Sequence, residues 1–303
     1  MNFTKAAKRT PLPNPPPQGG REPVRASGAS AGNQSEDRVF AANRAVSRVA
    51  VEVEAGKGGS RPKRVHEAGS LRVRFPGARS DELEAVLLNT AGGIAGGDAL
   101  EIAFAAGPAA RLVVTGAAAE KIYRSLGPDA SMKVRLEVGS GASLAWLPQE
   151  TILFDRARIS RSIEVDLAAD ARLILAEAVI FGRSGMGESV ESGRLVDRWR
   201  VRREGRLLFA DALRLEGAIA QKLAAAACAA GAVAIASVLL VPGDADLVSA
   251  VRAQTFCGEV GISAWNGLAL ARLLADTGAE LRQDLLSLLA ALRAGRLPRL
   301  WLN

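Results

Sequence analysis

Short segments in which apolar and polar residues alternate recur along this chain and constrain its fold more than any other feature. Alternation with a period of two places successive side chains on opposite faces of a β-strand. Gly- or Asp-bearing turns separate the segments. The pattern therefore predicts a mostly β protein. Its clearest examples are Leu71-Val73-Phe75, Leu100-Ile102-Phe104, Val134-Leu136-Val138, Ile163-Val165-Leu167, and Trp199-Val201 with the turn that leads to Leu207 and Phe209.

A loose internal echo adds to this expectation. The segments AAGPAARLVVT, VGSGASLAWLP and LAADARLILAE each place a turn of small residues before a strand. The strands are centred on Leu112, Leu144 and Leu173, at spacings of 32 and 29 residues. A repeat of this length is typical of stacked structural units. We expect a layered architecture, either solenoid-like or a twisted β sandwich.

The two ends of the chain differ from the middle. Residues 1–37 contain the run PLPNPPPQGGREP and are predicted to be a disordered, proline-rich tail, which leaves residues 38–303 as one β domain. Residues 263–275 and 279–294 are predicted to form two α-helices near the C-terminus, as a hairpin over about 263–294. An apolar stripe in the second helix fits packing on the β body or contact with a partner helix. The stripe consists of Leu281, Leu285, Leu288, Leu289 and Leu292.

Charge argues against a nucleic-acid partner, although the net charge is +7. Residues 1–74 hold 14 Lys and Arg against 6 Asp and Glu, whereas residues 75–303 hold 25 against 26. The basic excess is thus confined to the beginning of the chain, and no nucleic-acid-binding motif accompanies it.

Residues 223–241 carry no charge, but they are rich in alanine and end at Pro242-Gly243. This favours a linker or helix followed by a buried strand over a membrane span. Two distant cysteines, Cys228 and Cys257, make a disulfide framework improbable, so we expect a cytoplasmic protein.

No complete catalytic set is present in the sequence. The single histidine, His66, excludes a site built from two imidazoles of one chain, and neither Cys-x-x-Cys nor His-x-x-x-His occurs. Ser125 lies in the segment Lys121-Ile122-Tyr123-Arg124-Ser125, which holds the only tyrosine, but nothing marks a base for it. We therefore expect no enzyme activity and no tightly bound cofactor.

The most conspicuous local feature is a glycine block, Gly92-Gly93 and Gly96-Gly97, followed by Asp98. A phosphate loop requires a lysine here, and a dinucleotide fingerprint requires a different glycine spacing before a helix. A strand at Leu100 follows instead. The block predicts tight turns or close backbone approach, with Asp98 either bonded to the turn or facing a site.

Three carboxylates lie within apolar runs, where an acid is costly unless it is paired, solvated or bound to a ligand. They are Glu150, Asp155 and Glu177. Two interpretations remain open at this point. The acids form a polar lining inside the protein, where oxygen ligands suit a transiently held divalent ion, or each pairs with a nearby arginine.

Five blocks that occur here in order resemble the UreD (UreH) urease accessory protein family. They are LLNTAGGIAGGDALEI, VTGAAAEKIYRS, WLPQETILFDRARISRSIEVDL, LAEAVIFGRSGMGE and DRWRVRREGRLLFADALRLEG. The resemblance spans roughly residues 38–303 and includes the closing Leu297-Pro298-Arg299-Leu300-Trp301. It departs at Ala91 and Ala95, where Pro and Val are commoner in the family. The family-motif residues are Gly92, Gly93, Gly96, Gly97, Asp98, Tyr123, Arg124, Pro148 and Gln149.

The resemblance implies a non-enzymatic chaperone that acts in nickel insertion into apo-urease. It implies direct binding of the accessory protein UreF, a larger complex with the GTPase UreG, and docking on urease. A polar tunnel is proposed for the family as the route of the metal, and Glu177 matches an acid associated with it. We expect Glu177, with Glu150 and Asp155, to line a passage for transient Ni²⁺. The alternative is a small-molecule-binding β protein or an unrecognised hydrolase.

Overall fold

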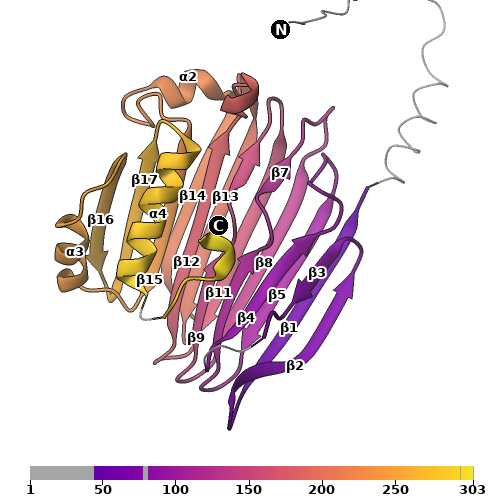
Figure 1. Cartoon of the computed structure of the whole chain (residues 1–303). Coiled ribbons are helices and arrows are strands. Elements are labelled where there is room, and N and C mark those ends of the chain that lie inside the picture. The colour runs from indigo at the N-terminus through magenta and orange to yellow at the C-terminus, as the bar shows by residue number, and fades with distance from the viewer. Residues whose placement is uncertain (1–43, 78–80, 294, 303) are drawn as a thin grey trace, which may run out of the picture. The chain divides into compact units, whose positions relative to one another are not determined.

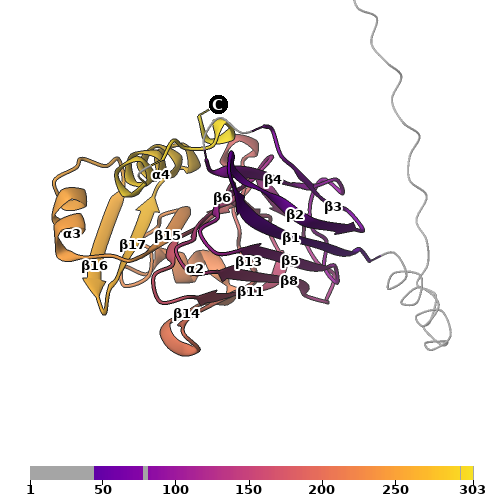
Figure 2. The same ribbon diagram turned by 90° about the horizontal axis from the view of Figure 1, so that it is seen from below.

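The computed structural model describes residues 44–77, 81–293 and 295–302, so the predicted tail 1–37 lies outside the described residues. Most of the described chain forms two β-sheets that face each other (Figure 1, Figure 2). The predicted mostly β fold is confirmed. Sheet A runs in the spatial order β14 (Arg206–Ala218), β13 (Ser192–Arg203), β11 (Arg158–Leu167), β8 (Ala130–Val138), β5 (Ala99–Ala106), β1 (Val46–Gly56) and β2 (Gly59–Ala68).

Sheet B is the larger sheet. Two short strands, β7 (Glu120–Ile122) and β10 (Thr151–Leu153), pair with each other, and β10 also pairs with β12. The main path runs in the order β16 (Glu259–Trp265), β17 (Leu268–Ala275), β15 (Ala234–Val241), β12 (Arg172–Phe181), β9 (Ser143–Leu147), β6 (Arg111–Gly116), β4 (Leu83–Asn89) and β3 (Leu71–Arg74).

The middle of the chain winds between the sheets as a coil. From β5 the chain passes to β6 and β7, returns to sheet A at β8, and repeats the path through β9, β10, β11 and β12. Equivalent strands of successive turns are parallel neighbours. In this register Leu144 pairs with both Leu112 and Leu173, so the internal echo in the sequence marks one position on three stacked strands. The solenoid-like layering is confirmed.

The core lies between the sheets because each strand points its apolar residues inward. Leu112, Leu144 and Leu173 are each at most 1% exposed, and Ile102, Val134 and Ile163 face them from sheet A. A second apolar cluster lies on the outer face of sheet B. It is covered by α3 (Ala245–Arg252) and α4 (Gly278–Leu292), which are the two helices near the C-terminus.

One part of the predicted helical hairpin is wrong. Residues 263–275 do not form a helix; they belong to β16 and β17, which pair antiparallel around Asn266 and Gly267. Both turn residues have positive φ, 49° and 74°, as a tight hairpin requires. The richness in Ala and Leu suggested a helix, but the Asn-Gly pair between two apolar runs is a hairpin signal that outweighs this composition.

The second predicted helix is present as α4. Its stripe residues Leu281, Leu285, Leu288 and Leu289 are buried, which supports the core interpretation of the stripe. The Thr277 hydroxyl accepts a hydrogen bond from the Glu280 backbone N–H and caps the first turn.

The uncharged segment 223–241 contains the end of α2 (Ile219–Ala224) and the buried strand β15, as the sequence predicted. Within the described ranges, no helix combines the length and the apolar character needed to cross a membrane. Two short 3₁₀ helices, η1 (Ser184–Met186) and η2 (Arg299–Trp301), complete the described elements.

Candidate functional site

A buried ionic network interrupts the apolar core between the sheets. Arg161 lies on β11 between the buried residues Ile159 and Ile163, and alternation therefore turns its side chain inward. Glu177 on β12 and Asp197 on β13 meet it there. The three residues are 4%, 6% and 6% exposed, so nearly all of their charge is removed from water.

Arg161 joins the two sheets. Its Nη1 forms an ion pair with Glu177 Oε2, and its Nη2 lies 2.5 Å from Asp197 Oδ2. The indole N–H of Trp146 donates to Glu177 Oε1 at 2.8 Å, so both oxygens of Glu177 have partners. By contrast, Asp197 Oδ1 is buried without a hydrogen-bond partner. The network thus retains one unused carboxylate oxygen.

The buried position changes the acid–base properties of these groups. Burial raises the pKa of Glu177 from 4.5 to about 7; Arg161 lowers it, and the neighbouring Asp197 carboxylate raises it. Burial opposes the charge of Arg161, but the two carboxylates hold its pKa above the usual value. Two acids and one base leave a net charge of −1 whenever both carboxyls are ionised. The site therefore attracts a proton or a cation at neutral pH.

A cavity of about 30 Å³ lies beside this network, large enough for one water molecule or a bare ion. Glu177 and Asp197 line its inner part, and Asp211 of β14 and Arg272 of β17 line the other part. Arg272 Nη2 lies 2.7 Å from Asp211 Oδ2, and these side chains are 50% and 26% exposed. An exposed ion pair therefore stands between the buried network and solvent.

The structure does not bring Glu150 to this network. Its neighbour Thr151 faces Arg161 between the sheets, at 3.4 Å from Thr151 Oγ1 to Arg161 Nη1, and Glu150 therefore points to the other face of sheet B. There its carboxylate lies 2.7 Å from Arg282 of α4. The Gln149 side chain also accepts from Arg282, so the segment after Pro148 anchors the C-terminal helix.

Asp155 also lies apart from Glu177. Its carboxylate accepts a hydrogen bond from the Ser192 backbone N–H at 3.0 Å and lies 3.5 Å from Arg156. It fastens one loop of the coil to the next. Each of the three predicted acids thus has an arginine partner. Across residues 44–77, 81–293 and 295–302, no group of three or more His, Cys, Asp or Glu side chains is arranged to hold a metal ion.

The glycine block is a set of turns packed against the next coil. Gly92 and Gly97 have φ of 77° and 90°, and a Cβ at Gly93 or Gly96 would collide with Tyr123 or Ser125. Asp98 accepts hydrogen bonds from the backbone N–H groups of Ala45 and Ala95 at 2.9 and 2.8 Å, so of the two roles left open it has the turn-bonding one.

The segment after β7 rests on this block. The Tyr123 hydroxyl donates to Gly92 O at 3.0 Å, and Arg124 forms an isolated β-bridge with Ala157. Beside the block, Asn89 donates to Glu120 at 3.1 Å, and burial raises the pKa of Glu120 to about 7 although this hydrogen bond lowers it.

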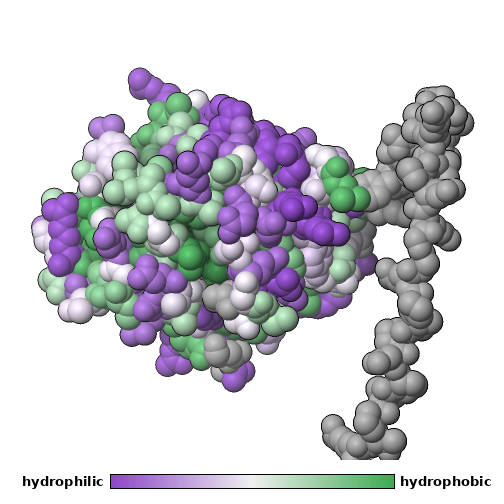
Figure 3. All heavy atoms as spheres, turned by 90° about the horizontal axis from the view of Figure 1, so that it is seen from above, coloured by the Kyte–Doolittle hydropathy of each residue, from purple (hydrophilic) through white to green (hydrophobic). Residues whose placement is uncertain are grey.

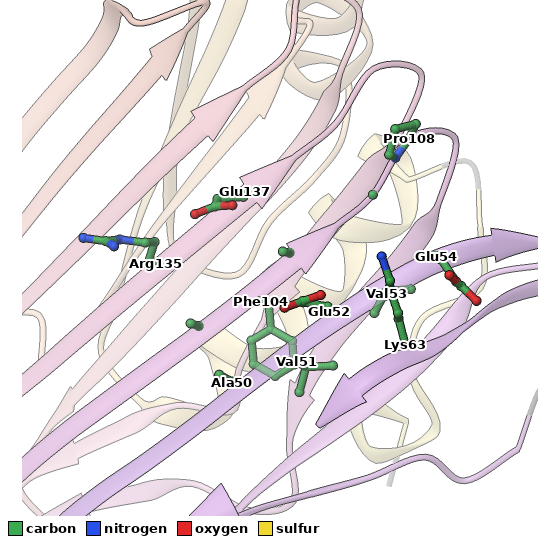
Figure 4. Close-up of a pocket in the computed structure, with 13 residues that line it drawn as sticks. Ala50, Val51, Glu52, Val53, Glu54, Lys63, Phe104, Pro108, Arg135 and Glu137 are labelled. Carbon is green, nitrogen blue, oxygen red and sulfur yellow. The ribbon is translucent and has the colours of Figure 1, made fainter. Parts of the chain in front are cut away.

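A wide hollow of about 570 Å³ lies on the outer face of sheet A (Figure 4). Its floor includes the small residues Ala50, Ala103 and Ala105, and charged side chains of both signs, such as Lys63 and Glu137, stand around it. These charged groups are exposed, and the hollow therefore offers no desolvated constellation for chemistry.

Sequence reasoning found Glu177 but missed its partners. Asp197 carries the same signal, an acid at an inward position between Leu195 and Trp199, in a strand whose outward positions include several arginines. Arg161 likewise occupies an inward position in an alternating strand. The alternation of inward and outward positions along β11 and β13 is the signal that identifies both residues.

The fold and the site define a class: a two-sheet β solenoid with an arginine–carboxylate network in its interior. The comparisons with known proteins agree in placing it. A family model described as UreD urease accessory protein matches residues 44–302. The chain therefore belongs to the UreD urease accessory protein family.

Curated relatives align with most of this chain and with nearly all of their own length. Urease accessory protein UreD of Rhodopseudomonas palustris strain BisA53 is 55% identical over 271 residues, which are 89% of this chain and 94% of that protein. The protein of the same name from strain CGA009 is 56% identical over 268 residues, or 88% and 96%. That of Bradyrhizobium diazoefficiens is 52% identical over 267 residues, with the same coverage of 88% and 96%.

Proposed function

We propose that this chain promotes the insertion of nickel into apo-urease, as a non-enzymatic scaffold in the cytoplasm that binds UreF directly and works in a complex with the GTPase UreG. Membership of the UreD family is the observation that carries this proposal, because the relatives are named as urease accessory proteins. In this proposal UreG hydrolyses GTP, and the glycine block of this chain forms turns before a strand.

The second part of the proposal concerns the route of the metal. Ni²⁺ is the cargo, and the cavity beside Glu177 and Asp197 is a segment of its path through the chain. The unpartnered Asp197 Oδ1 and the net negative charge of the network support this role. Weak oxygen contacts suit a conduit, because sites rich in histidine or thiolate bind nickel too tightly to release it.

Arg161 sets the strength of this attraction. Its guanidinium neutralises one of the two carboxylates, so a passing cation meets one net negative charge instead of two when both carboxyls are ionised. Both oxygens of Glu177 are already bonded, and Glu177 therefore contributes charge more than ligation. Glu150 and Asp155 lie on other surfaces and are left out of the path.

The test compares two buried acids of the same type in cells that express urease with the accessory set. Glu177→Gln keeps the size of the side chain but removes its charge and one of its two hydrogen-bond acceptors. We expect this variant to copurify with UreF as the unmodified chain does, while nickel per urease falls severalfold.

Glu150→Gln is the matched control. Like Glu177, Glu150 is a buried acid, only 7% exposed, but its carboxylate faces Arg282 of α4. Its nickel loading should equal that of the unmodified chain. Equal loading in both variants contradicts the conduit and leaves the scaffold intact. Full urease metallation in cells that lack this chain contradicts the whole proposal.

A further inference from the structure

The ionic network between the sheets holds three charged side chains away from the surface, where hydrophilic residues gather in Figure 3. Within the network, two polar atoms have no hydrogen-bond partner among the described residues: Nε of Arg161 and Oδ1 of Asp197. A buried polar group without a partner is destabilising. The arrangement in the structure therefore leaves one hydrogen-bond donor and one acceptor unused.

The two unused atoms belong to side chains that already touch. Nη2 of Arg161 lies 2.5 Å from Oδ2 of Asp197, while Nη1 binds Glu177 on the opposite sheet. We call this the bridged arrangement. Nε and Nη2 lie on the same side of a guanidinium, and their N–H groups can bind both oxygens of one carboxylate. In such a forked arrangement Nε binds Oδ1, both unused atoms gain partners, and Nη1 leaves Glu177.

The forked arrangement has a cost that explains why the structure shows the bridged one. When Nη1 leaves Glu177, Oε2 of that carboxylate loses its partner. Only the indole N–H of Trp146, which donates to Oε1, remains bound to it. A buried carboxylate without a counter-charge is strongly destabilising. Without a further cation, the guanidinium is therefore held between the two acids.

A cation at Oε2 removes this cost and turns Glu177 from a source of charge alone into a ligand. The cavity of about 30 Å³ is lined by all three network residues and has room for a bare ion. A ligand shifts an equilibrium toward the arrangement that binds it better. A cation in this cavity therefore favours the forked arrangement, which offers it a carboxylate that has lost its counter-charge.

We propose that Arg161 hands a divalent cation from Asp197 to Glu177 by changing from the bridged to the forked arrangement. The ion first meets Oδ1 of Asp197, and Nε then takes this oxygen while Nη1 releases Oε2 of Glu177. Because the guanidinium moves opposite to the ion, each carboxylate keeps a positive partner. Arg161 is a positioning residue here, since it binds the two carboxylates and not the ion. The exchange presupposes the proposed function, in which Ni²⁺ passes through this cavity.

The exchange gives the guanidinium a role that a lysine does not fill. An ammonium carries the same charge, but its single nitrogen cannot bind both oxygens of Asp197 in a fork. Arg161→Lys therefore keeps the charge of the network and blocks the exchange. Arg194→Lys is the matched control. Arg194 on β13 also joins two carboxylates, those of Asp129 and Glu216, but its side chain is 22% exposed and lies outside the network.

Two indole N–H groups report on the two acids separately. Trp146 donates to Glu177 at 2.8 Å, and Trp199 donates to Asp197 at 3.2 Å. The chain has four tryptophans, so the indole signals in NMR spectra of the full chain can be assigned from single Trp→Phe variants. The probe is Ni²⁺ alone, added to the purified chain. This ion is paramagnetic and broadens the signals of the nearest protons most.

In the unmodified chain and in Arg194→Lys, we expect Ni²⁺ to broaden the Trp146 signal more than the Trp199 signal, because the ion is passed to Glu177. In Arg161→Lys the ion stays at Asp197, and Trp199 should give the broader signal. In cells that express urease with the accessory set, Arg161→Lys should lower nickel per urease severalfold. Arg194→Lys should load urease as the unmodified chain does.

Three results overturn the exchange: stronger broadening of Trp199 in the unmodified chain, the same pattern in both lysine variants, or no broadening of either indole. If Arg161→Lys does not copurify with UreF, the two indoles of the unmodified chain still decide. Ni²⁺ that remains at Asp197 while urease is loaded normally rejects the exchange and leaves the conduit. Failure of the proposed function would instead appear as urease that acquires nickel without this chain.

Discussion

The interior between the sheets has two halves built on one architecture but filled with different chemistry. Around β5, β6 and β8 the space is apolar, with residues such as Ile102, Leu112 and Leu136 at most 3% exposed. Around β11, β12 and β13 the equivalent space is also lined by apolar residues such as Ile163 and Leu175, but it holds Arg161 and two carboxylates as well. The coil itself does not require the ions, since the same strand geometry forms without them. A buried ion pair is weak evidence for stability, and under the proposed function this one is part of the nickel path.

The largest effect should come from breaking the network on one side. Arg161→Met leaves Glu177 and Asp197 buried together without a counter-charge. We expect the free energy of unfolding to fall by about 3–5 kcal/mol, measured by urea denaturation at pH 7. In the apolar half, Leu144→Ala should cost about 2–5 kcal/mol through the cavity that it leaves.

A triple variant separates the stability of the network from its function. Arg161→Met, Glu177→Leu and Asp197→Leu together replace the ions by apolar side chains, although the indole N–H groups of Trp146 and Trp199 lose their acceptors. We expect the stability of this variant to lie nearer to that of the unmodified chain than to that of Arg161→Met alone, while urease loses nickel. A triple variant as unstable as Arg161→Met alone would show that the ions hold the two sheets together, and the contrast between the halves would lose its functional meaning.

The unfolding free energy should depend on pH through Glu177 of the ionic network, and this effect is smaller than that of Arg161→Met. The folded state raises the pKa of Glu177 from 4.5 to about 7, so it holds the proton more tightly than the unfolded chain does. This contribution is complete below about pH 4.5 and is lost as the pH rises to about 7. Glu177→Gln has no such proton. The unfolding free energy of the unmodified chain relative to this variant should therefore fall by roughly 3 kcal/mol over that range.

Calorimetry or denaturant titration from pH 4.5 to 7.5 measures this difference. Leu144→Ala serves as the control, because no titrating group is removed and its difference from the unmodified chain should stay constant. A constant difference for Glu177→Gln would mean that the network keeps Glu177 ionised in the folded state.

The sequence predicts the architecture well because each turn of the coil repeats the same pattern of residues. Leu112, Leu144 and Leu173 recur at nearly equal spacing, and register partners in parallel strands must recur in this way. The β16–β17 hairpin was not predicted, because its strands are rich in Ala and Leu and only the Asn266-Gly267 turn signals a hairpin. There the helix-favouring composition competes with the turn signal, and the pairing of β17 with β15 favours the strand.

The candidate site could be predicted only in part. An acid in an apolar run identifies Glu177, but the face on which Glu150 lies depends on how a three-residue strand sits in sheet B. The partner of Glu177 comes from the opposite sheet, 16 residues away in sequence, and that of Asp197 is 36 residues away. Alternation gives the face of a strand, whereas contact across two sheets depends on how the coils stack.

The smallest predicted effect concerns the border between the two halves. Thr151 is 7% exposed and its hydroxyl lies 3.4 Å from Arg161 Nη1, which is a long hydrogen bond at best. Thr151→Val has nearly the same shape and extends the apolar half by one side chain. Because Arg161 keeps both carboxylates, we expect the unfolding free energy to change by no more than about 0.5–1 kcal/mol and nickel delivery to persist. A loss of unfolding free energy as large as that for Arg161→Met would instead show that Thr151 belongs to the ionic network. The network would then include a residue of β10.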